Sequence, residues 1–254
     1  MIDTHCHLND EKAFPDPALE VEAANGVGVD RMFVIGLDPD NWKSAVDLAN
    51  RFKGVYAILG WHPNYTNDYQ SESLVVLRGL LQTPKVIALG EIGLDWYRTY
   101  ATRDQQMRAL EEQLDLAAEL DVPVVFHARE AYADLLDILE RRPPHPYLFH
   151  CWAGNQSEAR RAVQLGAYFG VDGPITYKKS TDLREVVASL PADRIVLETD
   201  SPYLTPEPMR GKPNRPAHIP LINLAVANLL GISEDECAEQ TTRNAETFFR
   251  IKSA

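Results

Sequence analysis

The chain has 254 residues, of which 45% are hydrophobic and 24% are charged, and this composition is typical of a globular protein with a sizeable core. Its net charge of -12 argues against a simple DNA-binding module, because proteins that coat nucleic acid non-specifically are usually basic. An enzyme acting on phosphodiesters is still allowed, since bound divalent cations can supply local positive charge.

Membrane and secretory features are not expected. No apolar run approaches the roughly 18 residues that a membrane span needs, and no basic region or cleavage site precedes the first apolar run. Cys6, Cys151 and Cys237 form an odd set without paired spacing, which argues against a disulfide framework. We therefore expect a cytoplasmic protein in a reducing environment.

Eight short apolar runs are expected to be strands. Their hydrophobicity is nearly continuous, which indicates burial on both faces, as in a parallel sheet. They cover residues 1–5, 31–37, 55–61, 85–93, 122–128, 146–152, 167–173 and 194–200. Helical patterns occur at 41–52, 103–120, 130–142, 157–166, 220–231 and 233–250. Ser233 with Glu236 predicts a capping box at the start of the last helix.

The spacing of these elements predicts an α/β fold, specifically a (β/α)8 TIM barrel. One strand–helix unit occupies about 32 residues, which is the size of a repeating unit in such barrels. A doubly wound open sheet would need a glycine-rich phosphate loop after its first strand, and none is present. The composition does not shift along the chain, so residues 1–254 are expected to form a single domain.

The stretch THCHLN ends the first predicted strand with two histidines. Because successive strand side chains point to opposite faces, His5 and His7 share one face and Cys6 points to the other. Two imidazoles on one face can bind one metal ion, but a lone H-x-H is equally compatible with polar residues capping a strand. The other strand ends must therefore decide between these interpretations.

Polar side chains also occur at the other strand ends, where active sites of TIM barrels lie. The set comprises His62 after the third strand, Glu91 and Asp95 at the fourth, His127 at the fifth, His150 at the sixth, and Glu198 and Asp200 at the eighth. Each buried polar group without a partner costs on the order of 1–3 kcal/mol, and one or two divalent metals would satisfy several together. These positions predict a metal site.

The expected ligands are His5, His7, Glu91, His127, His150 and Asp200. Glu91 can bridge two metals, which a neutral imidazole cannot do. Glu198 shares a strand face with Asp200 but lies deeper, so we expect it to support a ligand. His62 is compatible with a substrate contact or a turn role, and Asp95 with loop structure or a substrate contact. Cys6 and Cys151 alternate away from the neighbouring histidines and are expected to be structural thiols.

Several segments resemble motifs of the TatD-type deoxyribonucleases, a family of metal-dependent hydrolases. The similar segments are IDTHCHLN, GEIGLDW, PVVFHAREAYAD, FHCWAGN, LPADRIVLETDSPYL and GKPNRP. Phe126, Ala133, Trp152 and Ala153 depart from the residues usual at their positions. The resemblance spans nearly the full chain and implies a TIM barrel with two divalent metals that hydrolyses phosphodiesters, typically as a magnesium-dependent 3′→5′ exonuclease on DNA.

The resemblance also implies how the ligands divide. His5, His7, Glu91 and Asp200 would hold the first metal, and Glu91 would bridge to a second metal held by His127 and His150. Two such metals lower the pKa of a shared water and clamp the phosphate, with Asp200 as proton acceptor beside Glu91. This mixture of imidazole and carboxylate suits magnesium, manganese or zinc.

Substrate contacts and rival functions remain open at this stage. Basic residues near strand ends are Arg98, Arg129, Lys178, Lys179, Arg210, Lys212 and Arg215, with Arg129 and Arg215 the leading candidates. The same site could attack a carbonyl, as in an amidohydrolase or a D-aminoacyl-tRNA deacylase. Related barrels often bridge their metals with a carboxylated lysine, whereas the fourth strand here offers Glu91.

Two interpretations without catalysis also remain: a metal-binding barrel that serves as a scaffold, and a non-enzymatic nucleic-acid binder. Because every expected ligand is present, and because basic residues occur only in patches, the enzyme is favoured over both. The expected partner is a nucleic acid substrate, DNA first, with no membrane and no obligate protein partner. A monomer is the default expectation.

Overall fold

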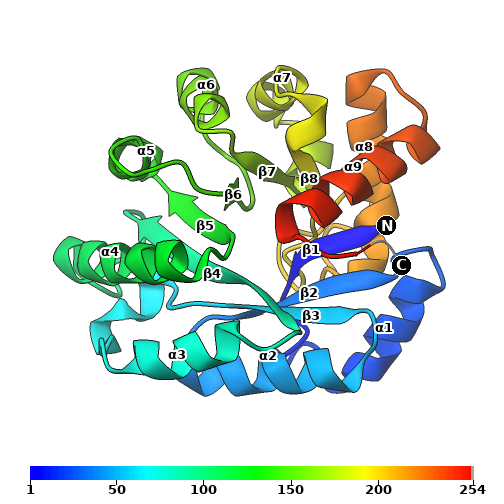
Figure 1. Ribbon diagram of the computed structural model, residues 1–254. Helices are drawn as coiled ribbons and strands as arrows, with labels where there is room; N and C mark the ends of the chain where they lie inside the picture. The colour runs from blue at the N-terminus through cyan, green and yellow to red at the C-terminus, as the bar shows by residue number, and fades with distance from the viewer. Residues whose placement is uncertain (253–254) are drawn as a thin grey trace.

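Eight parallel strands, paired in chain order, form the centre of the computed structural model, which describes residues 1–252 (Figure 1). The strands are β1 (Ile2–Cys6), β2 (Arg31–Gly36), β3 (Val55–Leu59), β4 (Val86–Asp95), β5 (Val124–Arg129), β6 (Tyr147–Phe149), β7 (Tyr168–Val171) and β8 (Ile195–Leu197). All eight predicted strands are present. The consecutive order confirms the predicted (β/α)8 barrel and excludes the doubly wound sheet.

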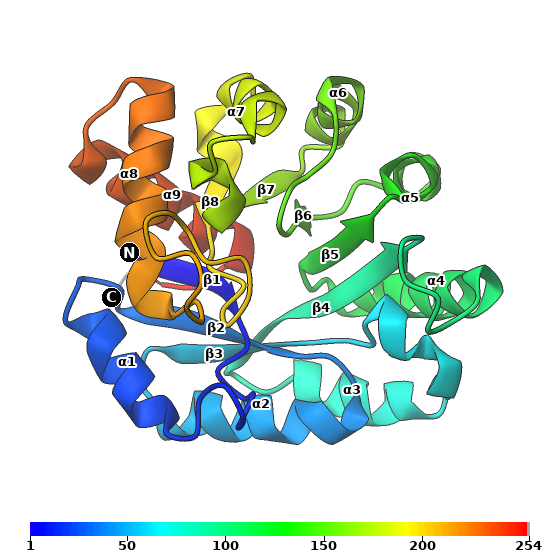
Figure 2. The same cartoon turned by 180° about the vertical axis from the view of Figure 1, so that it is seen from behind.

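The helices lie around the outside of the strands (Figures 1 and 2). They are α1 (Pro17–Asn25), α2 (Pro39–Arg51), α3 (Ser73–Leu81), α4 (Arg103–Leu120), α5 (Tyr132–Leu139), α6 (Gln156–Gln164), α7 (Thr181–Ala188), α8 (Ile219–Leu230) and α9 (Glu234–Phe249). Six of them match the predicted helices, whereas α1, α3 and α7 were not predicted. The capping box of Ser233 and Glu236 is confirmed at the start of α9.

Side chains help the backbone to close the barrel between β1 and β8. The segment that follows β8 makes an isolated parallel bridge with β1, Cys6 with Ser201, flanked by hydrogen bonds from Asp200 N to His5 O (2.9 Å) and from His7 N to Ser201 O (2.8 Å). Deeper in the barrel, Asp3 Oδ2 accepts a hydrogen bond from Thr199 Oγ1 at 2.6 Å. The barrel is therefore nearly closed, and the first strand lies beside the last.

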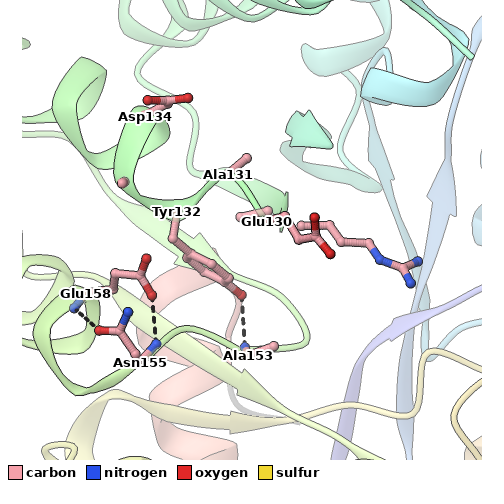
Figure 3. Close-up of a pocket in the computed structure, with 10 residues that line it drawn as sticks. Glu130, Ala131, Tyr132, Asp134, Ala153, Asn155 and Glu158 are labelled. Carbon is pink, nitrogen blue, oxygen red and sulfur yellow. Dashed lines mark hydrogen bonds between the residues drawn. The ribbon is translucent and has the colours of Figure 1, made fainter. Parts of the chain in front are cut away.

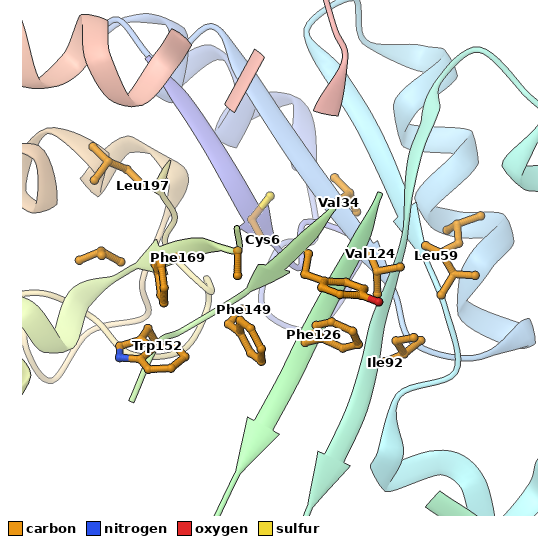
Figure 4. Packing of buried hydrophobic residues seen from close by; sticks show 14 of the residues in the cluster. Cys6, Val34, Leu59, Ile92, Val124, Phe126, Phe149, Trp152, Phe169 and Leu197 are labelled. Carbon is orange, nitrogen blue, oxygen red and sulfur yellow. The ribbon is translucent and has the colours of Figure 1, made fainter. Parts of the chain in front are cut away.

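Two hydrophobic clusters lie on opposite faces of the strands. The outer cluster packs against the helices and includes Phe126, Phe149 and Phe169 (Figure 4). The inner cluster fills the barrel with alternate residues of each strand. Its buried members are Ile2, Phe33, Ile35, Ile58, Ala88, Val125, Leu148, Tyr168 and Val196, together with Ala245, Phe248 and Phe249 of α9. The end of α9 therefore closes the amino end of the barrel.

No single helix among residues 1–252 is long and apolar enough to cross a membrane. The segments Pro216–Leu230 and Glu234–Phe249 pass that test only as a pair bent by 104°. Both helices contribute buried residues to the packing on the barrel, so this length and composition serve the core.

Candidate metal centre

The polar side chains of the centre continue the inward-facing rows of the barrel. Residues two positions apart on a strand share a face, so each inward apolar residue is followed by another inward side chain. The pairs are Val125 and His127, Leu148 and His150, and Val196 and Glu198. Glu91 lies where the pairing of β4 with β5 shifts register between Gly90 and Ile92, and such irregularities re-aim side chains. A polar layer thus lies above the apolar layer, at the carboxyl ends of the strands.

The Glu91 carboxylate is the centre of this layer and is 3% exposed. Its Oε1 lies 2.8 Å from His127 Nδ1, 2.8 Å from His150 Nε2 and 3.3 Å from His62 Nε2. Its Oε2 lies 3.3 Å from His5 Nε2. The two carboxylate oxygens therefore face different groups of imidazoles.

Asp200 contacts the two histidines that lie on the Oε2 side of Glu91, His5 and His7. Its Oδ1 lies 3.2 Å from His7 Nε2 and 3.7 Å from His5 Nε2. The His5 ring also stacks on the His150 ring, with 4.0 Å between the centroids. Three groups have ligand atoms close enough to hold a metal ion: His5, His7 and Asp200; His5, His150 and Glu198; and His62, Glu91 and His127. The structure thus brings all six predicted ligands together.

Unpaired nitrogens show that this donor set fits a cation. His5 is fully buried, and neither of its ring nitrogens makes a well-oriented hydrogen bond within the described part of the chain. The buried Nδ1 of His150 lacks such a bond as well. Leaving buried polar atoms unpaired is costly, and imidazole nitrogens with carboxylate oxygens are the donors that divalent metals of the zinc and manganese type prefer.

The ionisation of the centre reflects crowding of opposite charges. Burial alone would raise the pKa of Glu91, but the neighbouring His150 and His62 hold this pKa well below its usual range. Burial lowers the pKa of His5. For His150, burial opposes the charged form, yet Glu91 and Glu198 raise its pKa well above the usual value. The neighbouring carboxylates therefore favour the protonated form of His150, and a cation bound there would compete with that proton.

Asp95 holds one of the predicted ligands in place. This residue is 1% exposed, and its Oδ2 lies 3.1 Å from His127 Nε2 and 3.2 Å from Asn64 Nδ2. Its Oδ1 accepts hydrogen bonds from the backbone N–H groups of Tyr97 and Arg98. Asp95 therefore has the loop role considered from the sequence, and it also orients His127, which was not foreseen.

Glu198 lies beneath His150, in the deeper position expected for it. Its Oε1 is 3.5 Å from His150 Nδ1 and accepts a hydrogen bond from Cys151 N at 2.5 Å. A Cβ atom on Gly170 would lie 2.2 Å from Glu198 Oε2. Glycine on the neighbouring strand thus leaves the space that this buried carboxylate occupies.

His62 both caps a turn and faces the centre. Its Nδ1 accepts a hydrogen bond from Asn64 N at 3.0 Å, at the start of the 3-10 helix Pro63–Asp68. With Nδ1 engaged in this turn, Nε2 is the ring nitrogen that faces Glu91, and burial lowers the pKa of the ring. His62 therefore has the turn role considered from the sequence, and its ring also belongs to one of the three groups close enough to hold a metal.

The two leading arginines have different surroundings. Arg215 Nε and Nη2 each lie 2.7 Å from an oxygen of Glu20 on α1, so the guanidinium is already paired with this acid. The structure therefore does not bring Arg215 to the centre as a free phosphate-binding group. Arg129 makes no ion pair within residues 1–252, and its guanidinium lies 3.8 Å from the ring centroid of Tyr97.

A pocket of about 440 Å³ opens between the segments that follow β5 and β6. It is lined by Ala128, Arg129, Glu130, Ala131, Tyr132, Ala133, Asp134, Ala153, Asn155 and Glu158 (Figure 3). The Tyr132 hydroxyl accepts a hydrogen bond from Ala153 N across this pocket. None of the predicted ligands is among the lining residues, so the donor set itself lies outside this pocket.

Asp172 is a buried acid that sequence reasoning missed. It is 2% exposed, and its Oδ2 has no hydrogen-bond partner within the described residues. Burial and the nearby Glu198 raise its pKa well above the usual value. The signal was available, because Asp172 lies two residues beyond Gly170 and four beyond the inward-facing Tyr168, at the end of β7.

The two thiols next to histidines lie outside the cluster of ligand groups. Cys6 is fully buried in the outer hydrophobic cluster, and its Sγ lies 3.4 Å from Phe33 O. Cys151 belongs to none of the three groups that could hold a metal. Neither thiol adds a ligand atom to the centre.

Comparison with known proteins agrees with this geometry. The sequence profile of the family described as TatD related DNase matches residues 2–250. The chain is 35% identical to a 3′-5′ ssDNA/RNA exonuclease TatD of Pantoea vagans, over 99% of this chain and all of that protein. It is 34% identical to the uncharacterized metal-dependent hydrolase YabD of Bacillus subtilis, over 99% of both.

A solved structure shows the same agreement. The TatD homologue YJJV of Escherichia coli superposes with a TM-score of 0.93 at 33% identity, covering 99% of this chain and 98% of that one. An engineered lactonase template for organophosphate hydrolysis, with a TM-score of 0.66 and 14% identity, shares the fold alone. The predicted resemblance is therefore confirmed, and the chain belongs to the TatD-related DNase family of metal-dependent hydrolases.

Proposed function

We propose that this hydrolase is a nuclease that removes nucleotides from the 3′ end of a single-stranded nucleic acid, with DNA as the first substrate to test. The observation that carries the proposal is the Glu91 carboxylate, whose Oε1 faces three imidazoles at 2.8–3.3 Å while its Oε2 faces His5 at 3.3 Å. A carboxylate in that position suits a pair of cations that clamp a phosphodiester. The name of the Pantoea relative supports the same activity.

We assign the donors to two divalent cations, either magnesium, manganese or zinc. His5, His7, Asp200 and Oε2 of Glu91 would hold one of them. His127, His150 and Oε1 of Glu91 would hold the other. Imidazole and carboxylate donors are compatible with all three metals, so the identity of the ion is a question for metal analysis.

The side chains of the centre have separate tasks in this reaction. When bound, the cations supply the positive charge that acidifies the attacking water and neutralises the phosphate. Asp200 would accept the proton of that water, since its Oδ1 lies among the imidazoles of His5 and His7. His62, whose Nε2 faces Glu91 Oε1, would contact the substrate from beside that carboxylate, and Arg129 would offer an unpaired positive charge to a phosphate oxygen.

The experiment uses the purified protein, stripped with EDTA and then supplied with magnesium, manganese or zinc. A short single-stranded DNA labelled at its 5′ end should give a ladder of products shortened from the 3′ end, and EDTA should abolish it. The same preparation should hydrolyse bis-p-nitrophenyl phosphate. Hydrolysis of an aminoacyl ester or an amide, with none of either phosphodiester, would instead establish the carbonyl-directed alternative.

We also propose that one chain is the active unit and needs no obligate protein partner, because a single chain supplies every side chain of the centre described above. Light scattering after size exclusion, with activity measured across the peak, tests this proposal, and activity confined to a larger species would contradict it. A cytoplasmic location is proposed on chemical grounds, since Cys6, Cys151 and Cys237 are free thiols.

A further inference from the structure

Exposed tyrosines are concentrated at one end of the barrel. Tyr65, Tyr97, Tyr100 and Tyr203 are 43%, 51%, 63% and 56% exposed, and all follow the carboxyl ends of strands. The other large apolar side chains with comparable exposure in the described chain are aliphatic and lie on or next to helices. They are Leu19, Val27, Val75, Val76, Leu224 and Ile232. Exposure of aromatic rings is therefore specific to the end that carries the metal centre.

Two of these rings contact histidines of the centre. The Tyr203 ring meets the His7 ring edge to face, with 5.8 Å between centroids, and the Tyr65 ring meets the His62 ring in the same way at 6.0 Å. Burial raises the pKa of the Tyr65 hydroxyl, and the carboxylates of Asp38 and Glu91 raise it further. Tyr65 and Tyr203 therefore lie directly beside the metal centre.

Arginines accompany the remaining rings. The Arg129 guanidinium lies 3.8 Å from the Tyr97 centroid, and that of Arg98 lies 5.3 Å from Tyr97 and 5.9 Å from Tyr100. Neither arginine has an acidic partner at ion-pair distance among residues 1–252. On a chain with a net charge of -12, these exposed rings therefore keep unpaired positive charge beside them. Aromatic faces combined with positive charge are the chemistry by which proteins hold single-stranded nucleic acid.

We propose that Tyr65, Tyr97, Tyr100 and Tyr203, here called the tyrosine rim, form the platform on which the unpaired bases of the substrate's 3′-terminal nucleotides stack. This inference rests on the proposed function and deepens it by naming the groups that select the substrate. Stacking uses the face of a base, which every base has, so the rim would tolerate all sequences. Bases inside a duplex are already stacked and paired, so the rim would select single-stranded ends.

The test compares two strands that share their phosphates and differ in their bases. One is an ordinary single-stranded DNA, and the other has abasic sites at its 3′-terminal nucleotides. For the ordinary strand we expect Tyr97→Ser and Tyr203→Ser each to raise KM about five- to tenfold, which corresponds to the lower range of base–aromatic stacking. Tyr97→Phe and Tyr203→Phe should retain the wild-type KM, because the aromatic face remains.

The abasic strand separates stacking from a structural role. Wild-type KM should rise on this strand, and the Tyr→Ser substitutions should add no further increase, because no base is left to stack. An equal increase on both strands, or no increase on either, would overturn the platform. Should a serine variant unfold, Tyr→Leu removes the π face while preserving apolar bulk. Val75→Ala on α3, where the side chain is 74% exposed, is the matched surface control.

A binding measurement keeps this inference distinct from the proposed function. Fluorescence anisotropy with a cleavage-resistant phosphorothioate strand and magnesium-loaded protein should show the same order of affinities: wild type and Tyr→Phe together, then Tyr→Ser. Wild-type protein that cleaves neither strand would count against the proposed function itself. Wild-type protein that degrades ordinary and abasic strands with equal KM would overturn the rim alone and leave the nuclease in place.

Discussion

The two ends of the barrel interior are built from the same strands, but one is filled by apolar side chains and the other by histidines and acids. At the amino end, the inward residues are apolar and the chain supplies its own cover, with the Phe249 ring 4.8 Å from that of Phe33. At the carboxyl end, the next inward residues are histidines and acids, and the ring nitrogens of His5 make no well-oriented hydrogen bond within residues 1–252. Burial of apolar area stabilises the amino end. At the carboxyl end, the buried nitrogen and oxygen atoms are suited to bind a cation.

This comparison predicts that substitutions at the two ends separate activity from stability. The largest expected effect is on activity at the carboxyl end. Glu91→Ala should lower turnover at least about a thousandfold, because bridging charge stabilisation is worth several kcal/mol in the transition state. Its thermal unfolding should stay close to that of wild type, since Glu91 lies above the packed apolar layer.

The control for this substitution is Glu119→Ala on α4, where an exposed acid pairs with Arg78. Turnover on the labelled DNA strand and circular dichroism during heating are the measurements. Near-wild-type turnover in Glu91→Ala would remove the bridging role.

At the amino end, Phe249→Ala should lower the free energy of unfolding by about 3–5 kcal/mol, the usual cost of emptying a buried phenylalanine site. The side chain is 3% exposed and packs against both Phe33 and Phe248. Denaturant unfolding measures the loss, and turnover of the folded fraction should be unchanged. A large fall in turnover without loss of stability would show that the two ends are not separable.

Binding of a metal at the carboxyl ends of the strands should stabilise the folded protein. A cation at 100 times its dissociation constant adds about 2.7 kcal/mol to the folded state by mass action, which raises Tm by several degrees. Differential scanning calorimetry of EDTA-stripped protein, titrated with magnesium, manganese and zinc, measures this rise. The rise should be reduced in Glu91→Ala, and an identical rise in both proteins would place the stabilising ion elsewhere.

The smallest expected effect is that of Asp95→Asn, which removes the charge that orients His127. Loss of such an outer partner typically costs ten- to a hundredfold in metal affinity or activity. Calorimetric titration of the metal and the turnover rate should fall together. Asp47→Asn on α2, where the acid is 65% exposed, should change neither. Unchanged metal affinity in Asp95→Asn would leave Asp95 as a loop residue only.

Local patterns were sufficient for much of this molecule. Continuous apolar runs revealed all eight strands, and the rule that active-site residues lie at the carboxyl ends of barrel strands led to His127, His150 and Asp200. The same rule, applied to AYFGVDG, leads to Asp172, which was overlooked. The irregular pairing of β4 near Glu91 is not visible in a single segment, because register depends on the neighbouring strands.

The sequence by itself determined the barrel, its family and the residues that line one of its ends, because periodicity and motifs are local properties of a chain. Only the tertiary structure decided that Glu20 pairs with Arg215, that Asp95 contacts His127, and that two exposed tyrosines contact histidines of the centre. These contacts connect residues that are distant along the chain. Whether a charged side chain has a partner depends on which residues the fold brings next to it.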